Sequence, residues 1–492
     1  MTDEYLLGLD VGTSGVKALL VAIDGEVVAS TTTPLTLSTP RPGWAEQDPD
    51  AWWAASVASI LAARERKPKA RIAAVGISGQ MHSSVFLDAK GKVIRPALLW
   101  CDGRTTAECR EIEQDVGGEE RLRELAANPA LEGFTLPKVL WLRNHEPSAF
   151  ARLATVLLPK DYIRYRLTGE LATEPSDASA TLLFDTARLR WSSEMFRAVG
   201  LSESIVPRVG GSSEILGCVS TEGSAACGLA VGTPVVGGGA DNACGAAGVG
   251  VIAPGDMVAS WGTSGTLLAP TSEPRVDPGL RAHTFCHVAP KTWYIMGVVL
   301  SAGGAFGWFR DQFARDLAGD PEINRRLNDE AAAIPRGADG VTFLPYLQGE
   351  RTPHRNALAR GAFLGLSLAH TRAHLTRAVL EGVCFALRDS FSILQSLGLT
   401  PDVLLVTGGG SRSGFVRQLQ SEILGVSVTS VNREEGPAYG AALLAAVGVG
   451  AYPDLHAAAH ATVERQPAVT PLPNTHRAYD APYARFREGY RA

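Results

Sequence analysis

The tetrapeptide GTSG occurs twice in this chain, at 12–15 and again at 262–265, half a chain later. Each copy lies between two apolar runs that are typical of β-strands, LLGLDV and VKALLV around the first, MVASW and TLLAP around the second. A glycine-rich turn directs several backbone N–H groups to one side, and Thr and Ser hydroxyls add donors, so it can bind an anion. A single copy is more typical of a structural hairpin turn. Two copies favour a pair of facing hairpins that hold one polyphosphate between two similar domains.

Size and composition agree with a globular protein of more than one domain. A length of 492 residues predicts two to four domains, and the hydrophobic share of 45% and charged share of 20% are ordinary for folded proteins. The net charge of −5 argues against nucleic acid or an anionic membrane as a partner. The basic stretch at 63–71 is interpreted as the exposed end of a helix.

The start of the chain, its apolar runs and its cysteines indicate location and redox state. The acidic start leads directly into a strand, which predicts no signal peptide. No apolar run approaches the roughly 20 residues that span a bilayer. Seven cysteines without a CxxC spacing predict reduced thiols. We therefore expect a cytoplasmic protein with no membrane partner and no cysteine-bound metal.

The coarse pattern predicts an α/β fold with a central joint. Short strand-like runs alternate with helical stretches such as 50–66 and 371–397. The passage 232–256 is rich in glycine, is central in the chain and precedes the second GTSG, so we expect a flexible hinge there. It divides the chain into a domain at 1–243, carrying the first hairpin, and a domain at 244–492, carrying the second hairpin.

Two further glycine turns lead into helices. The stretch 402–425 reads as a strand, a loop with Gly408 and Gly409, a Ser413 N-cap and an amphipathic helix, which presents a helix N-terminus to an anion or nucleotide. The turn at Gly303 has a similar but less specific pattern. A well-capped connection with no ligand is the alternative for both.

Two carboxylates lie in these glycine-rich surroundings. Asp10 ends the strand before the first hairpin, where Mg²⁺ would neutralise phosphate charge. Asp241 follows the strand in the central passage, where it can accept the proton of a hydroxyl that attacks a γ-phosphate. An Asp that caps a loop is the alternative for each.

Two strand ends could bind the acceptor of such a reaction. Gln80, Met81 and His82 follow one strand, and Trp100 and Asp102 follow another. A sugar needs an apolar face together with fixed hydrogen-bonding groups, and these two turns supply both. A structural role for His82 is the alternative.

In order along the chain, the motifs LGLDVGTSGVK, GISGQMHSS, LPKDYIRYRLTGE, GGGADNACGAAG, SWGTSGT, FLPYLQGERTPHRNALARGAFLGL and VTGGGSRS resemble those of the FGGY carbohydrate kinases, from about residue 5 to about residue 450. The resemblance implies a duplicated actin-like, ribonuclease H-like fold in which ATP and a sugar meet in the interdomain cleft. Among the members, the similarity is greatest to those that convert D-xylulose to D-xylulose 5-phosphate.

The same resemblance implies roles for individual residues. Asp241 would be the general base and Asp10 the carboxylate associated with Mg²⁺. The expected ATP contacts are Gly12, Thr13, Ser14, Lys17, Gly262, Thr263, Gly303, Gly408, Gly409 and Ser413. The expected sugar contacts are Gln80, Met81, His82, Trp100, Asp102, Asp241 and Asn242. Glycerol kinases have Arg-Glu in place of Met81-His82, which argues against glycerol as the substrate.

Three other functions stay open at the level of sequence. They are a kinase for another ketose or polyol, an actin-like ATPase that changes shape without an acceptor, and a sugar-responsive regulator, which would carry a DNA-binding domain. The sequence leaves the oligomeric state open, and a homodimer is the hypothesis to test. ATP turnover with and without pentuloses separates the kinases from the ATPase.

Overall fold

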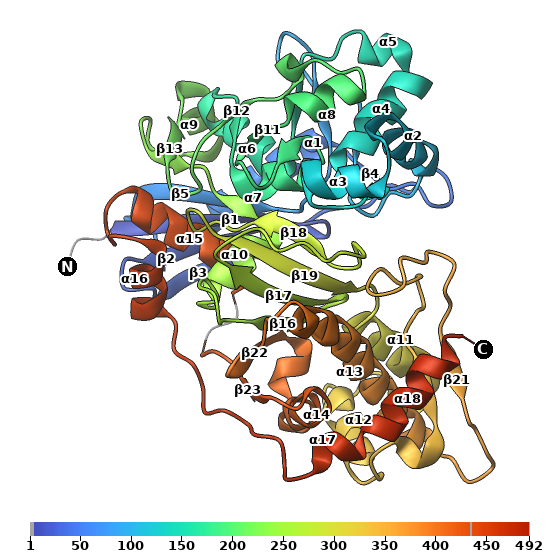
Figure 1. Ribbon diagram of the computed structural model, residues 1–492. Helices are drawn as coiled ribbons and strands as arrows, with labels where there is room; N and C mark the ends of the chain where they lie inside the picture. Colours follow the sequence, from blue (N-terminus) through green and yellow to red (C-terminus); the bar gives the residue numbers. More distant parts are fainter. Residues whose placement is uncertain (1–3, 433–434, 492) are drawn as a thin grey trace.

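The computed structural model describes residues 4–432 and 435–491, which form two α/β halves, each built on a mixed sheet (Figure 1). The first sheet has the order β13-β14-β5-β1-β2-β3, with β15 beside β5. Its strands are β1 Glu4–Val11, β2 Gly15–Ala22, β3 Val27–Pro34, β5 Arg71–Gly79, β13 Ile215–Cys218, β14 Pro234–Val236 and β15 Gly239–Ala240. Nearly every residue in the middle of β1 is buried, as in a strand covered on both faces.

The second sheet repeats the first. Its order is β18-β19-β17-β16-β22-β23, formed by β16 Val258–Trp261, β17 Gly265–Thr271, β18 His283–Cys286, β19 Trp293–Val299, β22 Val403–Gly408 and β23 Ser427–Thr429. Both sheets contain three antiparallel strands (β1, β2, β3 and β16, β17, β19) followed by two parallel ones (β5, β14 and β22, β23). The predicted duplication is therefore confirmed, and both GTSG turns join the first two strands of their sheet.

The helices expected from apolar periodicity form on the outer faces of the sheets. Helix α1, Pro49–Glu65, covers the first sheet, and α13, Arg372–Ser396, with α14, Gly414–Leu424, covers the second (Figure 1). The other helices that matter for the site are α4 Thr135–His145, α7 Pro175–Ala178, α11 Gly303–Phe313, α12 Ile323–Ala332 and the 3₁₀ turn η5 Gly409–Arg412. None of the helices formed by the described residues is long and apolar enough to cross a membrane.

Helices α10, Asp241–Gly248, and α15, Pro437–Gly448, lie between the two sheets (Figure 1). The two helices cross at Gly440 of α15, where an added Cβ would lie 1.9 Å from the carbonyl oxygen of Cys244 in α10. Helix α15 also packs on β1 and β5 at glycines. Cβ atoms on Gly8 and Gly76 would lie 2.0 and 1.8 Å from the carbonyl oxygens of Ala438 and Ala441. Helix α15, which belongs to the second half of the chain, therefore packs closely on the first sheet.

The central glycine-rich passage, in which a flexible hinge is expected from sequence, contains a helix. Its residues Asp241–Gly248 form α10, because Ala and other small side chains allow a helix that packs closely on α15. The boundary between 243 and 244 lies inside this helix and stays a prediction.

Candidate active site

The first hairpin is joined to the two strand ends that were expected to bind the acceptor. The Gly12 N–H donates to the carbonyl of Gly15 at 3.1 Å and closes the turn. The Thr13 hydroxyl accepts from the Trp100 indole Nε1 at 2.9 Å and donates to Gln80 Oε1 at 3.2 Å. Three residues from separate sequence motifs thus form one hydrogen-bonded group, with Ser14 exposed at the tip of the turn.

Asp10 and Lys17 lie opposite each other in the β1–β2 register. Burial raises the pKa of the Asp10 carboxyl to about 6, and the charge of Lys17 opposes this rise. Asp10 Oδ1 is buried and has no hydrogen-bond partner among the described residues. Lys17 Nζ pairs with Glu435 Oε2 at 2.6 Å and also donates to the Glu435 carbonyl, so it links the first hairpin to the entry of α15.

Asp241 is the first residue of α10, directly after β15. Asn242 donates two hydrogen bonds to Asp241 Oδ1, from its backbone N at 2.7 Å and from Nδ2 at 3.0 Å. Burial raises the pKa of the Asp241 carboxyl to about 7, and the negative charge of Asp10 adds to the rise. One oxygen of the carboxylate is therefore held in place, and the pKa of the group lies near neutral pH.

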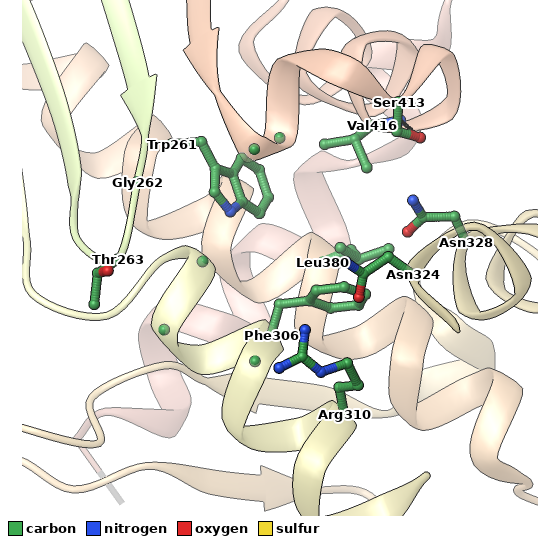
Figure 2. A pocket seen from close by; sticks show the side chains of 15 residues that line it. Trp261, Gly262, Thr263, Phe306, Arg310, Asn324, Asn328, Leu380, Ser413 and Val416 are labelled. Carbon is green, nitrogen blue, oxygen red and sulfur yellow. Dashed lines mark hydrogen bonds between the residues drawn. The ribbon is translucent and has the colours of Figure 1, made fainter. Parts of the chain in front are cut away.

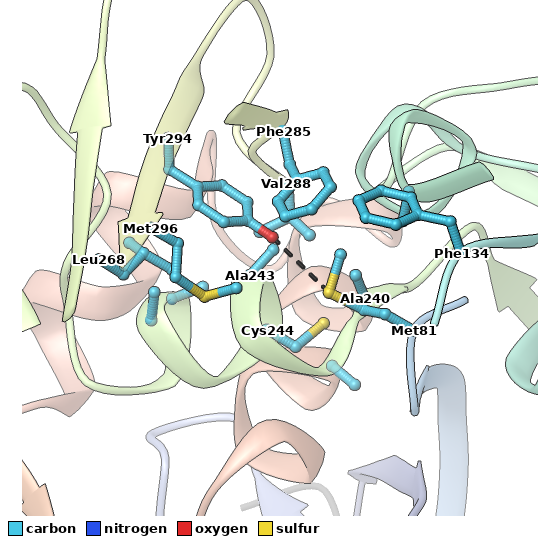
Figure 3. Close-up of a cluster of buried hydrophobic side chains, with 14 of the residues drawn as sticks. Met81, Phe134, Ala240, Ala243, Cys244, Leu268, Phe285, Val288, Tyr294 and Met296 are labelled. Carbon is cyan, nitrogen blue, oxygen red and sulfur yellow. Dashed lines mark hydrogen bonds between the residues drawn. The ribbon is translucent and has the colours of Figure 1, made fainter. Parts of the chain in front are cut away.

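Met81 joins α10 to the second half of the chain. Its Sδ accepts from Asn242 Nδ2 at 3.5 Å and from the Tyr294 hydroxyl at 3.8 Å. Figure 3 shows Tyr294 pointing toward Met81, with Phe285 and Phe134 beside them. The sulfur is a weak acceptor, so these contacts orient the thioether more than they stabilise it.

His82 is almost fully buried among aromatic rings, with its ring centre 4.5 Å from that of Phe134. Its Nδ1 lies 2.7 Å from the Ala180 carbonyl, which fixes Nδ1 as the protonated nitrogen of a neutral ring. Burial lowers the pKa of His82 to about 3. Nε2 is therefore an acceptor near neutral pH.

Asp102 has partners within the protein at both oxygens. Oδ2 accepts from the Ala45 N–H at 2.6 Å and from Arg104 Nη2 at 2.7 Å, while Oδ1 accepts from the Arg104 N–H at 3.0 Å. The side chain is completely buried. These contacts favour a structural role in holding the turn after Trp100, and a sugar contact by Asp102 stays a prediction.

The second hairpin borders a cavity of about 340 Å³. The N–H groups of Gly303 and Gly304 donate to the carbonyls of Gly262 and Thr263 at 2.8 and 2.9 Å, so the start of α11 is bound to the hairpin. In Figure 2, Thr263 and Asn328 lie on opposite sides of the cavity. The residues predicted from sequence that line it are Gly262, Thr263, Gly303, Gly409 and Ser413.

A second cavity, of about 310 Å³, contains Asp241 and Asn242. Gly408 lines this cavity and the next residue, Gly409, lines the first, so the two are neighbours along one loop. Residues of the first hairpin line neither cavity and stay predicted phosphate contacts. Among the described residues no group of three or more His, Cys, Asp or Glu side chains is placed to hold a metal ion.

Several lining residues were not anticipated from sequence. Asn324 and Asn328 are four residues apart on α12 and line the first cavity, and Asn328 Oδ1 is buried without a hydrogen-bond partner in the described part of the chain. Arg412 lines the second cavity, although its motif had been singled out only for its glycines and Ser413. The i, i+4 spacing of the two asparagines was the only available signal, and it does not distinguish a ligand from solvent.

Models of the N-terminal and C-terminal domains of the FGGY family of carbohydrate kinases match residues 5–248 and 257–449. The chain is 42% identical to the xylulose kinase of Escherichia coli (strain K12) over 442 residues, 90% of this chain and 89% of that one.

Two crystal structures have the same fold over nearly the whole length. Xylulose kinase from Rhodospirillum rubrum is 32% identical with a TM-score of 0.90, covering 99% of this chain and 98% of that one. Gluconate kinase from Lactobacillus acidophilus is 27% identical with a TM-score of 0.92 and the same coverage.

Proposed function

The chain belongs to the FGGY family of carbohydrate kinases, and from that premise we propose that it transfers the γ-phosphoryl group of ATP to the 5-hydroxyl of D-xylulose. The observation that carries the proposal is the place of Asp241. Its carboxylate lies in a cavity that adjoins the nucleotide-sized cavity on one side, and its neighbour Asn242 contacts Met81 of the sugar-side turn on the other. Similarity to the xylulose kinase of Escherichia coli supports the choice of sugar.

Asp241 acts as the general base through Oδ2. Oδ1 already accepts two hydrogen bonds from Asn242, which leaves Oδ2 to accept the proton of the substrate hydroxyl. A carboxylate with a pKa of about 7 is a stronger base than an ordinary aspartate. As the O5–Pγ bond forms, the bond between Pγ and the β,γ-bridging oxygen breaks, the proton moves to Oδ2, and ADP leaves.

The nucleotide lies in the cavity beside the second hairpin. Its base occupies the end lined by Asn324 and Asn328, across the cavity from Thr263, and its phosphates follow the glycine loop toward Asp241 (Figure 2). Asn328 Oδ1, which has no partner among the described residues, is positioned to accept from an amino group of the base. The Thr13 and Thr263 turns contact the phosphates from the two halves.

The residues present fit a Mg²⁺ ion that is held mainly by the nucleotide. Asp10 Oδ1 is a buried acceptor without a partner among the described residues, and a carboxylate oxygen suits this hard cation, directly or through its water. When bound, Mg²⁺ neutralises phosphate charge.

The sugar is bound by the group that the first hairpin and the end of β5 bring together. His82 Nε2 accepts from a sugar hydroxyl, Trp100 supplies an apolar face, and the apolar side of Met81 borders the carbon chain. Glycerol, with three carbons, cannot contact these groups and Asp241 together.

The test is an ADP-release assay of the purified chain with D-xylulose, L-ribulose, glycerol and gluconate. We expect the highest kcat/KM with D-xylulose. A higher kcat/KM with gluconate or glycerol would overturn the sugar assignment and keep the kinase. ATP hydrolysis that no sugar stimulates would overturn the kinase reaction itself.

A further inference from the structure

The cavity that holds Asp241 has an unusual distribution of charge. Of the residues that line it, Asp241 is the only anion and Arg412 the only cation among those that the structure describes. The other polar lining groups are uncharged, including the hydroxyls of Ser260, Thr266 and Thr407. A ligand in this cavity therefore meets one carboxylate and one guanidinium.

Arg412 is placed by the same loop that connects the two cavities. It ends the turn η5, which begins at Gly409, and it follows β22 by four residues. A nucleotide whose phosphates follow this loop from the first cavity would reach the second cavity beside Arg412. The side chain is exposed, so it can turn toward a ligand at small cost in packing.

The other cations near the cleft already have partners. Lys17 pairs with Glu435 at 2.6 Å, and Arg417 donates to the carbonyl of Ser411. Arg412 forms no ion pair with any residue in the described part of the chain. Of these three cations, Arg412 alone lines the cavity, and no carboxylate of the described residues balances its charge.

The start of α15 adds to the same positive field. Gly436 and Pro437 line the cavity, and α15 is 12 residues long, so the partial positive charge of its N-terminus faces the ligand space. Two independent features of one cavity thus favour a group with negative charge.

From these observations we propose that Arg412 is a further catalytic residue, whose guanidinium binds the equatorial oxygens of the γ-phosphoryl group during its transfer. The inference rests on the proposed function. As the O5–Pγ bond forms and the bond from Pγ to the bridging oxygen breaks, the proton goes to Asp241 Oδ2 and the bonding electron pair leaves with ADP. The guanidinium offers two parallel N–H donors, which match two phosphoryl oxygens. A lysine supplies charge without that fork.

The experiment compares Arg412→Ala and Arg412→Lys with a charge-matched control, Arg465→Ala. Arg465 pairs with Asp256 and lines neither cavity. We expect Arg412→Ala to lower kcat by on the order of 10²–10³ and Arg412→Lys to lower it less. The control should keep wild-type kcat, and added guanidinium should partly restore Arg412→Ala.

Nucleotide binding gives a second readout that does not depend on turnover. By calorimetry, we expect Arg412→Ala to weaken binding of the non-hydrolysable analogue AMPPNP by about tenfold, as loss of one charge-assisted contact would. The affinity for ADP, which lacks the γ-group, should change less than about threefold.

Either of two results would overturn the proposal: a kcat of Arg412→Ala within about threefold of wild type, or equal losses of affinity for AMPPNP and ADP. If the wild type uses a sugar other than D-xylulose, the variants are compared on that sugar, so the assignment of the acceptor and the role of Arg412 fail separately. If no sugar is used, the ratio of the AMPPNP and ADP affinities decides.

Discussion

At the scale of the residue, the surroundings of Asp241 suit the general-base role proposed for it. The two hydrogen bonds from Asn242 hold Oδ1, while burial and Asp10 raise the proton affinity of the group. We expect Asp241→Asn, which keeps the shape and removes the base, to lower kcat by on the order of 10²–10⁴. ATP affinity should stay within about threefold, because the hairpins are elsewhere. Steady-state kinetics and calorimetry test this, and a variant with more than half of wild-type kcat would exclude the role.

The pH dependence of kcat/KM follows from the same carboxylate. The base works only when it is ionised, so activity should rise with pH and level off above the pKa of Asp241, about 7. Below that value it should fall about tenfold per pH unit. Because the charge of Asp10 raises this pKa, Asp10→Asn should move the midpoint to lower pH.

Since Asp10 is also the proposed Mg²⁺ contact, its variant needs a measurement that does not depend on turnover. Infrared difference spectra of wild type against Asp241→Asn follow the titration of the Asp241 carboxyl directly. An unchanged midpoint in Asp10→Asn would contradict the coupling.

The raised pKa also predicts a cost in stability. The folded protein favours the protonated form of Asp241, so stability falls as pH rises from the ordinary aspartate pKa of 3.8 to about 7, and the loss is complete above that range. Asp241→Asn cannot ionise and should therefore raise the Tm at pH 8 by more than at pH 5. Thermal unfolding at the two values is the measurement, and an equal or opposite shift would argue against an ionised, desolvated Asp241.

At the scale of elements, the crossing of α10 and α15 determines where Asp241 lies. A methyl group on Gly440 would lie 1.9 Å from the Cys244 carbonyl, three residues along α10 from Asp241. Gly440→Ala should therefore separate the helices, destabilise the protein by about 1–3 kcal/mol and lower kcat.

A matched control for this substitution is Gly414→Ala, because no atom lies within 4 Å of the added methyl group at the start of α14. It should be neutral in chemical unfolding and in kcat. Equal effects of the two substitutions would show that the helix crossing is not the cause.

At the scale of the whole molecule, the proposed nucleotide cavity belongs to the second half and the proposed sugar group mostly to the first. Phosphoryl transfer needs both ligands in contact and water excluded, so we expect the halves to close when both are bound. Small-angle scattering should show a smaller radius of gyration with D-xylulose and AMPPNP together than without ligand. An unchanged radius would contradict closure, and each ligand alone serves as the control.

The sequence by itself determined the parts of this protein that depend on neighbouring residues. Glycine and hydroxyl side chains make the two hairpin turns, and the strand, loop and Ser413 cap of the third motif form as expected, because turn and cap preferences are local. The ordered motifs also sufficed to predict the duplicated fold.

The tertiary structure alone decided which of these parts meet. The bond from Trp100 to Thr13, the pairing of Lys17 with Glu435 and the partners of Asp102 join segments that no local pattern relates. The placement of Arg412 and Asp241 on one cavity is of the same kind. Such contacts depend on how whole sheets and helices pack, and packing is set by the complementary shapes of distant surfaces rather than by the preferences of adjacent residues.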